Sequence, residues 1–199
     1  KLGVWSVAGG MHGLASSLAR LAAARGATFR YASEVARIEL SGGRASGVVL
    51  ADGERLPADI VISNADVAAL ADGRFGADVR RAVKAQPAAR RSLSAVTWCL
   101  AARAEGFPLA RHTVFFSNRY QSEFDDIFVH RRLPATPTVY VCAQDRDDSG
   151  TAPVGSRERV LVLANAPAIG DQRELDSDEL AAYEARSFGM LERCGLRIE

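Results

Sequence analysis

Two adjacent glycines, Gly9 and Gly10, stand directly before a stretch with helical periodicity, and they are the first residues of the chain that could bind a cofactor. The N-terminus of a helix presents backbone N–H groups that lack intrahelical partners, together with a partial positive charge, so it suits a phosphate group. The doublet lacks the three spaced glycines of the dinucleotide-binding pattern. A tight structural turn is therefore the alternative.

A second polar group, Ser63 to Asp66, follows the apolar residues 60–62. Open α/β sheets bind their ligands at the carboxyl ends of strands. This placement makes Asn64 and Ala65 candidates for contact with a cofactor. The alternative is a turn in which Asp66 caps a short helix over residues 67–71.

Nucleophilic and metal chemistry find little support in the sequence. The histidines, His12, His112 and His130, are isolated, and no serine or cysteine lies in a nucleophile-elbow pattern. The three cysteines are far apart and odd in number, which fits neither a zinc site nor a disulfide framework and indicates a reducing compartment. The acidic residues of 144–157 lack the calcium-loop pattern, so a solvated loop is favoured. We therefore predict no catalytic side chain and no metal site.

Aromatic residues are concentrated in the middle of the chain and could line an apolar binding site, because they supply large apolar surfaces. The six candidates for substrate binding are Trp98, Phe115, Phe116, Tyr120, Phe124 and Phe128. An ordinary aromatic core is the alternative for each of them.

The hydrophobic periodicity predicts the elements that position these residues. A helix follows Gly10 and ends at Gly26, and strands at residues 35–40 and 48–50 are separated by Gly42 and Gly43. Residues 60–62 are apolar on both faces, which predicts a buried strand. The alternation of helices and strands predicts an α/β (α+β) chain with a mixed sheet and packed helices.

The same reasoning predicts the elements of the remaining chain. A helix is expected over residues 74–91, a short helix over 120–128 with Phe124, Ile127 and Phe128 inward, and a final helix capped by Asp176 or Ser177. The expected strands are residues 92–102, 112–117, 138–142 and 159–164.

Composition limits the classes of function. The chain has 199 residues, of which 48% are hydrophobic, enough for one sizeable core or for one domain plus part of another. Its net charge is +1 and no basic stripe is present, so we expect no nucleic-acid partner. No apolar run approaches the roughly 18 residues that would span a bilayer.

Two stretches carry a resemblance to a known family. Residues 7–66 contain GGM at the start of a helix, EVARI in a strand and ADIVISNAD at the end. They resemble the middle of FAD-dependent flavoproteins of the amine oxidase and phytoene desaturase superfamily. Residues 112–168 resemble the substrate-domain segment of the bacterial carotenoid desaturases. The likeness is sharpest to the hydroxyneurosporene and methoxyneurosporene dehydrogenases, which introduce a 3,4 double bond into 1-hydroxy or 1-methoxy carotenoids, and it covers nearly the whole chain.

The resemblance implies that the chain is an internal fragment of an FAD enzyme. Gly9 and Gly10 then lie near the flavin crevice, the main chain of Val35 pairs with the adenine edge of FAD, and Asn64 and Ala65 contact the cofactor. Residues 1–64 would form part of the FAD-binding domain, 65–168 the substrate-binding domain, and 169–199 a helix that returns toward the missing C-terminal part. The fragment alone is expected to be inactive and to lose FAD.

The resemblance also implies a carotenoid substrate, with the six aromatic side chains lining the polyene. His112 and Tyr120 could meet a terminal hydroxyl or methoxy group, and a structural hydrogen bond is the alternative for each. We expect a cytoplasmic location, with the parent enzyme peripheral to the inner membrane, and self-association through exposed strand edges. Another FAD-dependent oxidoreductase of the superfamily and a noncatalytic interaction domain remain the alternative functions.

Overall fold

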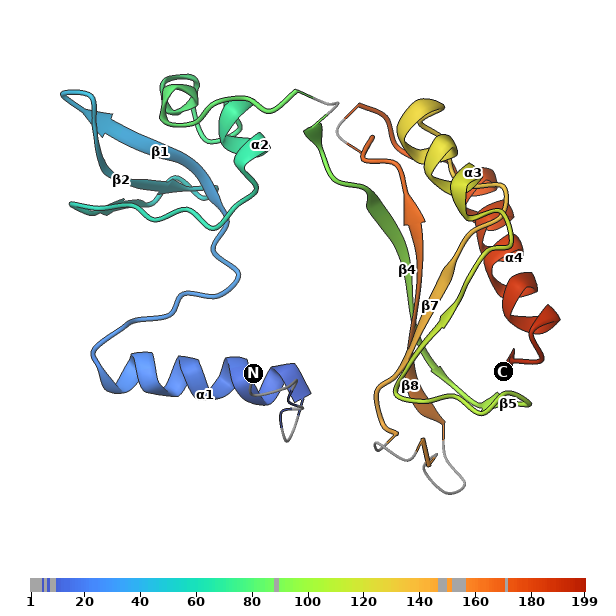
Figure 1. The fold of residues 1–199 in the computed structure, drawn as a ribbon. Helices are drawn as coiled ribbons and strands as arrows, with labels where there is room; N and C mark the ends of the chain where they lie inside the picture. Colours follow the sequence, from blue (N-terminus) through green and yellow to red (C-terminus); the bar gives the residue numbers. More distant parts are fainter. Residues whose placement is uncertain are drawn as a thin grey trace. The chain divides into compact units, whose positions relative to one another are not determined.

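The computed structural model describes Trp5, Val7 and residues 10–87, 90–146, 150–151, 157–170 and 172–199. The chain divides into two compact units, Lys1–Ala85 and Gln86–Glu199 (Figure 1). Helices stand beside separate sheets, which confirms the α+β prediction, and every pairing between described strands is antiparallel. The boundary between the units falls later in the chain than the domain boundary expected after Asn64, and residues 169–199 belong to the second unit.

The first unit begins with helix α1 (Gly10–Ala24), as predicted, and the chain leaves it through Gly26 at φ +90°. Three antiparallel strands follow, in the order β1-β2-β3. Gly42 and Gly43, both with positive φ, form the turn of the first hairpin because this geometry favours glycine. The strands are β1 (Val35–Ser41), β2 (Arg44–Leu50) and β3 (Arg55–Pro57).

Two predictions for the first unit are wrong. Residues 60–62 form no strand, and the side chains of Ile60 and Ile62 are 77% and 90% exposed. A strand that is apolar on both faces needs a pairing partner and a layer on each side, and no described strand pairs with these residues. The helix expected over residues 74–91 is reduced to a 3-10 turn, η1 (Ala77–Ala82). Gly76 at φ +116° precedes this turn, and extended Val83 ends it.

The second unit is built on a four-stranded sheet in the order β4-β8-β7-β6. All four predicted strands are confirmed. They are β4 (Ser94–Ala102), β6 (His112–Phe115), β7 (Val139–Ala143) and β8 (Glu158–Ala166). A two-stranded pair, β5 (Ala104–Glu105) with β9 (Arg197–Ile198), brings the end of the chain back beside the end of β4.

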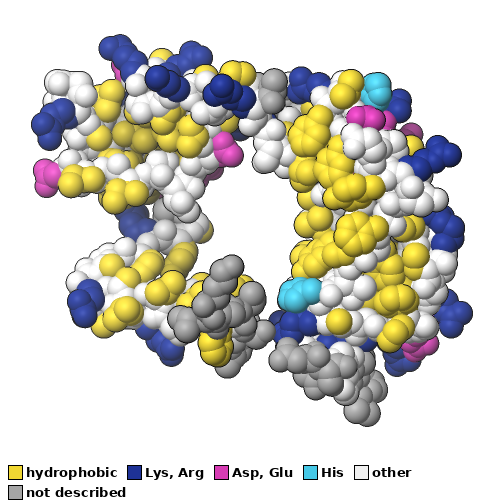
Figure 2. All heavy atoms as spheres, viewed as in Figure 1, with side chains coloured by type: hydrophobic (Ala, Val, Ile, Leu, Met, Phe, Trp, Pro, Cys, Tyr) yellow, Lys and Arg dark blue, Asp and Glu magenta, His cyan; other side chains and the backbone are white. Residues whose placement is uncertain are grey.

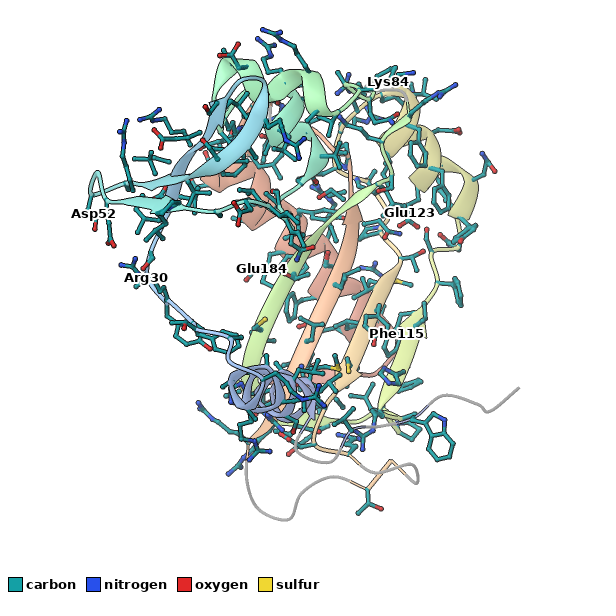
Figure 3. The ribbon with its side chains drawn as sticks, turned by 90° about the vertical axis from the view of Figure 1, so that its left-hand side faces the viewer. Arg30, Asp52, Lys84, Phe115, Glu123 and Glu184 are labelled. Carbon is teal, nitrogen blue, oxygen red and sulfur yellow. The ribbon has the colours of Figure 1, made fainter. Side chains whose placement is uncertain are left out.

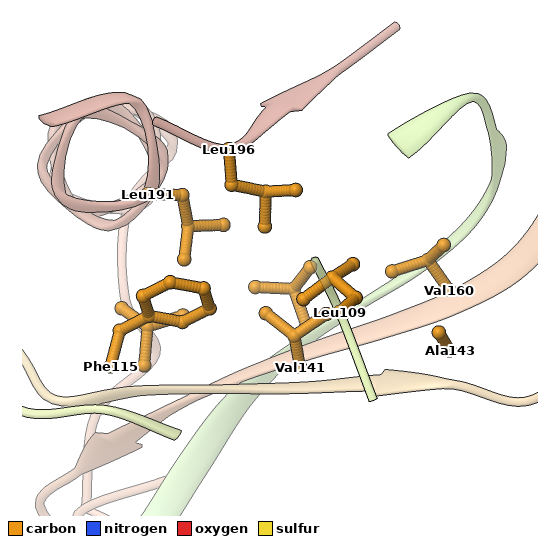
Figure 4. Close-up of a cluster of buried hydrophobic side chains, with 9 residues drawn as sticks. Leu109, Phe115, Val141, Ala143, Val160, Leu191 and Leu196 are labelled. Carbon is orange, nitrogen blue, oxygen red and sulfur yellow. The ribbon is translucent and has the colours of Figure 1, made fainter. Parts of the chain in front are cut away.

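Helix α4 (Ser177–Arg193) covers one face of this sheet (Figure 1). The predicted cap is Asp176, which accepts the N–H of Glu179 while the Glu179 carboxylate accepts the N–H of Asp176. Alternate residues of the central strands point toward the helix and are almost fully buried. Figure 4 shows this core, whose members include Leu109, Phe115, Val141, Val160, Leu191 and Leu196.

A short helix, α3 (Tyr120–Phe124), continues into a π-helical turn, η3 (Asp125–Val129). The inward residues are Glu123, Asp126 and Ile127, whereas Phe128 is 54% exposed, so the prediction that Phe128 points inward is wrong. Hydrogen bonds explain the difference. Asp126 accepts the Arg132 guanidinium and the Ala135 N–H, which fixes the acidic side chain inward.

A buried ion pair ties together one end of the sheet. Arg146 donates to both carboxylate oxygens of Glu158, at 2.9 and 2.6 Å, and the two side chains are 6% and 4% exposed. Arg146 also donates to the carbonyl oxygens of Leu109 and Ala104. The pair therefore connects β8 with the segment between β4 and β6.

Candidate functional site

The sheet face opposite α4 carries the main candidate site. Strand alternation turns Val160 and Val162 toward the helix and leaves Leu161 and Leu163 on the other side, where they are half-buried. Figure 3 looks onto this side of the sheet, with α4 behind it. The register places the following residues together on what we call the open face: Thr97, Cys99, His112, Val114, Tyr140, Cys142, Leu161 and Leu163. Most of these side chains are apolar, so the open face is suited to an elongated apolar ligand.

Four of the predicted substrate-binding residues form one continuous group, which we call the aromatic ladder: Phe116, Tyr120, Phe124 and Phe128. They are four positions apart, and neighbouring ring centroids are 5.9, 5.0 and 6.2 Å from one another. Phe116, Tyr120 and Phe128 are 64%, 50% and 54% exposed. Figure 2 shows hydrophobic side chains gathered on the surface of the second unit that faces the viewer. Exposed aromatic rings in a contiguous row are typical of a binding surface rather than of a core.

The structure does not bring the other two aromatic candidates to the ladder. Trp98 points toward α4, where its indole N–H donates to Glu184 at 2.8 Å and its ring meets Phe188 edge to face. Phe115 is 5% exposed and packs against Phe107 in the core. Both residues fit the core alternative that the sequence left open.

The open face contains one hydrogen-bonded polar pair, His112 and Tyr140. The Nδ1 atom of His112 is 2.7 Å from the Tyr140 hydroxyl, and the two rings are stacked, with 11° between their planes. Burial, together with the neighbouring Cys142 thiol, raises the pKa of Tyr140 to about 12. Tyr140 therefore keeps its proton at neutral pH. The sequence singled out His112 but missed Tyr140, although the alternation of the β7 residues contained the signal.

A buried carboxylate attaches α3, which carries two residues of the aromatic ladder, to the sheet. Glu123 of α3 is fully buried and accepts hydrogen bonds from the Thr138 N–H at 3.1 Å and from the Asn165 side-chain amide at 2.9 Å. The backbone carbonyl oxygen of Asn165 in turn accepts a hydrogen bond from the hydroxyl of Tyr183 on α4. Burial and the nearby Glu123 charge raise the pKa of Tyr183 above its ordinary value. The ladder is thus positioned by hydrogen bonds that run from α3 through β8 to α4.

The predicted cofactor-binding residues lie on three separate elements of the first unit. Gly10 begins α1 at φ +70°, and its N–H donates to Val7; Gly9 lies outside the described residues. Val35 begins β1, which is an edge strand, and it pairs with Leu50 on one side only. Asn64 and Ala65 are exposed.

The capping alternative at the second polar group is confirmed, because Asp66 accepts the Ala68 N–H at 2.7 Å and begins α2 (Val67–Ala71). A helix N-terminus and a strand edge, both of which this unit contains, are the kinds of backbone group that a flavin nucleotide can contact. The first turn of α1 contains no acidic residue, and β1 pairs with a described strand on one side only at Val35. No described hydrogen bond joins these three elements into one site.

The first unit also contains a hollow of about 800 Å³ between β1 and η1. Its lining is mostly apolar and includes Ile38, Leu40, Leu70 and Val79, together with Ser63. Asp78 and Arg81, the charged residues at its edge, form an ion pair with each other at 3.0 Å and are strongly exposed. The hollow therefore presents mainly apolar surface, and the charges of Asp78 and Arg81 are paired with each other.

Within the described part of the chain, no three His, Cys, Asp or Glu side chains are grouped so that they could hold a metal ion. Among the same residues, none of the helices has the length and apolar character required to cross a bilayer.

Comparison with known proteins agrees with the resemblance. Residues 1–189 match the family described as flavin containing amine oxidoreductase. A protein of Rubrivivax gelatinosus named hydroxyneurosporene desaturase is 53% identical over 99% of this chain, and a protein of the same name from Cereibacter sphaeroides is 43% identical over 99%. A 4,4'-diapolycopene oxygenase of Methylomonas sp is 34% identical over 98%.

These alignments extend over almost the whole chain but over only part of each relative. The chain spans 37% to 39% of the length of these curated relatives. The family match itself covers both compact units, from the residues before α1 to the last turns of α4. The chain belongs to the flavin containing amine oxidoreductase family.

Proposed function

We propose that the protein containing this chain is an FAD-dependent carotenoid desaturase that removes hydrogens from an acyclic hydroxy- or methoxy-carotenoid by 3,4-desaturation, in carotenoid biosynthesis. The observation that carries the proposal is the 53% identity, over 99% of the chain, to a protein named hydroxyneurosporene desaturase. The exposed apolar surface of the second unit gives the proposal a physical basis.

The open face and the aromatic ladder would bind the polyene. Removing apolar surface from water contributes about 25 cal/mol per Å², so a long polyene gains affinity along its whole length when it lies against the leucines of β8 and the aromatic rings. Aromatic side chains also stack favourably on extended π systems. The residues of this unit would therefore bind and orient the substrate and exclude water from it.

When bound, FAD supplies the acceptor for the electrons that dehydrogenation releases. The chain would contribute backbone contacts to that cofactor at the start of α1 and at Val35, with Asn64 and Ala65 as further contacts. A helix N-terminus and a strand edge can make such contacts without a specific side chain. The fragment alone would neither retain FAD nor be active.

The test uses the full-length protein that contains this chain, purified with its flavin and supplied with hydroxyneurosporene. We expect a product that has lost two hydrogens and absorbs at longer wavelength, detected by chromatography and mass spectrometry. Tyr120→Ser, in the aromatic ladder, should raise KM about tenfold, since one buried aromatic contact is worth about 1 to 2 kcal/mol. Tyr31→Ser is the matched control, because Tyr31 is 78% exposed and belongs to the first unit. A flavin-loaded protein that desaturates no acyclic carotenoid would overturn the proposal.

A carotenoid oxygenase is the second candidate, because the Methylomonas relative is named as one. The same assay separates the two functions, since an oxygenase product gains oxygen whereas a desaturase product loses two hydrogens. An amine oxidase would instead turn over amines and leave the carotenoid unchanged.

We also propose that the full-length protein is cytoplasmic and binds peripherally to the inner membrane, because its substrate is a lipid and the aromatic ladder exposes apolar surface. Flotation with vesicles that contain anionic lipid would test membrane binding. Self-association is proposed through the edge strands β4 and β6. Sedimentation of the 199-residue chain at several concentrations would test it.

A further inference from the structure

We infer that His112 and Tyr140 recognise the polar end group of the carotenoid, with the Nε2–H of His112 donating a hydrogen bond to the hydroxyl or methoxy oxygen. This inference rests on the proposed function and adds to it the residues that select the oxygenated substrate.

The first observation is the position of the pair on the open face. His112 lies opposite Cys142 in the register, and Val114 lies opposite Tyr140, so the pair spans the edge strand β6 and its neighbour β7. The His112 side chain is exposed and that of Tyr140 is half-buried. A ligand lying on the open face would therefore reach the imidazole directly.

The second observation concerns the orientation of the imidazole. The Tyr140 hydroxyl keeps its proton and can donate it to Nδ1 of His112 over 2.7 Å. When the hydroxyl is the donor in this hydrogen bond, the ring proton lies on the other nitrogen, Nε2, which has no hydrogen-bond partner among the described residues. Stacking of the two rings restricts rotation of the imidazole. The pair thus presents one oriented, unsatisfied donor to the open face.

The third observation is the gradient of polarity along the face. From His112 the chain passes Val114 to Phe116, about 13 Å away at roughly 3.3 Å per strand residue, and the aromatic ladder continues from there. In the other direction the next exposed side chain of β8 is Arg159, whose charge is already paired with Asp145. A molecule with one polar end and a long apolar chain matches this order, with its oxygen at His112 and its polyene directed toward the ladder.

The same geometry explains discrimination between substrates. A carotene without an oxygen would cover the Nε2–H without satisfying it, and a buried unsatisfied donor is unfavourable. An oxygenated carotenoid removes that penalty. Selectivity of this kind is larger than that achieved by apolar contacts alone.

The experiment compares hydroxyneurosporene with neurosporene, which lacks the hydroxyl, as substrates of the flavin-loaded full-length enzyme. His112→Phe should lower kcat/KM for hydroxyneurosporene about tenfold or more and leave kcat/KM for neurosporene unchanged or raised, because a hydrogen bond is lost only with the first substrate. Tyr140→Phe should produce a smaller loss in the same direction. His112→Gln, which keeps an N–H donor, should recover part of the loss. His130→Phe, at an exposed histidine that follows η3, is the matched control.

Two results would overturn the inference in different ways. An equal loss for both substrates in His112→Phe, accompanied by a lower melting temperature, would show that the pair only stabilises the sheet. Failure of the unmodified, flavin-loaded enzyme to convert either carotenoid would overturn the proposed function itself.

Discussion

The buried pair Arg146 and Glu158 provides the sharpest test of how the second unit is held together. Arg146→Met keeps an unbranched side chain but removes every donor, so the Glu158 carboxylate, whose side chain is 4% exposed, loses its ion-pair partner. The carbonyl oxygens of Leu109 and Ala104 lose hydrogen bonds of 3.0 and 3.3 Å. Breaking a buried ion pair from one side costs about 3 to 5 kcal/mol, and we expect a loss of about 4 kcal/mol.

The assay is urea unfolding followed by tryptophan fluorescence. The chain has two tryptophans, Trp5 and Trp98, and in a Trp5→Phe background the remaining Trp98 reports the packing of α4 on the sheet. The midpoint should fall while the dependence of the unfolding free energy on urea concentration stays unchanged, since the change affects stability rather than the surface exposed on unfolding.

Two further variants define the outcome. In Arg146→Met/Glu158→Met both charges are absent, so this variant should recover at least about 2 kcal/mol of the loss. Arg173→Met breaks an ion pair with Glu179 that is more exposed, since the two side chains are 45% and 35% exposed. This change should lower the free energy of unfolding by less than about 1 kcal/mol. The reasoning is refuted if Arg146→Met costs no more than Arg173→Met, or if the double variant recovers nothing.

Three other predictions follow from contacts in the same unit. Gly106→Ala should cost about 1 to 3 kcal/mol, because Gly106 has φ +88° and a Cβ would overlap the carbonyl oxygen of Gly195, whereas Gly170→Ala, with no atom within 4 Å of the added carbon, should change unfolding little. Asp176→Ala should cost about 1 kcal/mol through loss of the α4 cap, seen as a lower melting temperature; an unchanged value would contradict the capping geometry. The hydrogen bonds from Arg159 lower the pKa of Asp145 in the folded protein. The Asp145 carboxylate therefore stabilises the fold above the pKa of about 3.9 that it has in the unfolded chain, and this stabilisation is lost as the pH falls through the lower pKa of the folded protein. The stability difference between the parent chain and Asp145→Asn should therefore shrink on acidification below about pH 4, and a difference that stays constant would contradict the ion pair.

Much of the second unit could be predicted from alternation and caps, because its strands pair with one another within the chain. The strand expected over residues 159–164 is the centre of β8, and Asp176 caps α4 as expected. The apolar run 60–62 has the same kind of sequence signal and forms no strand, since no described strand pairs with it. Local pattern therefore predicted structure only where the pairing partner was also present.

The candidate site was partly predictable for a similar reason. The spacing of four between Phe116, Tyr120, Phe124 and Phe128 is visible in the sequence, and so is the isolated His112. The partner of His112 depends on the register between β6 and β7, which sequence periodicity does not specify between strands so far apart in the chain. The assignment of Phe115 to the core and Phe116 to the ladder depends on which sheet face α4 covers.

The inward side of residues 120–128 was only partly predicted, because Ile127 is 3% exposed, as expected, whereas Phe128 is 54% exposed. The physical reason bears on function. Hydrophobic residues are expected inward, yet in this segment the fully buried side chain is Glu123, while Tyr120 and Phe128 are half or more exposed. Burial of a carboxylate is unfavourable unless its hydrogen bonds are satisfied, and both oxygens of Glu123 are satisfied by the sheet. This arrangement leaves the aromatic rings without a covering layer in their own unit. The fold thereby forgoes the stabilisation that burying their apolar area would give, which a helix with only a structural role would gain. The buried carboxylate thus fixes this segment with its aromatic rings exposed, an arrangement that suits the apolar-ligand surface we propose.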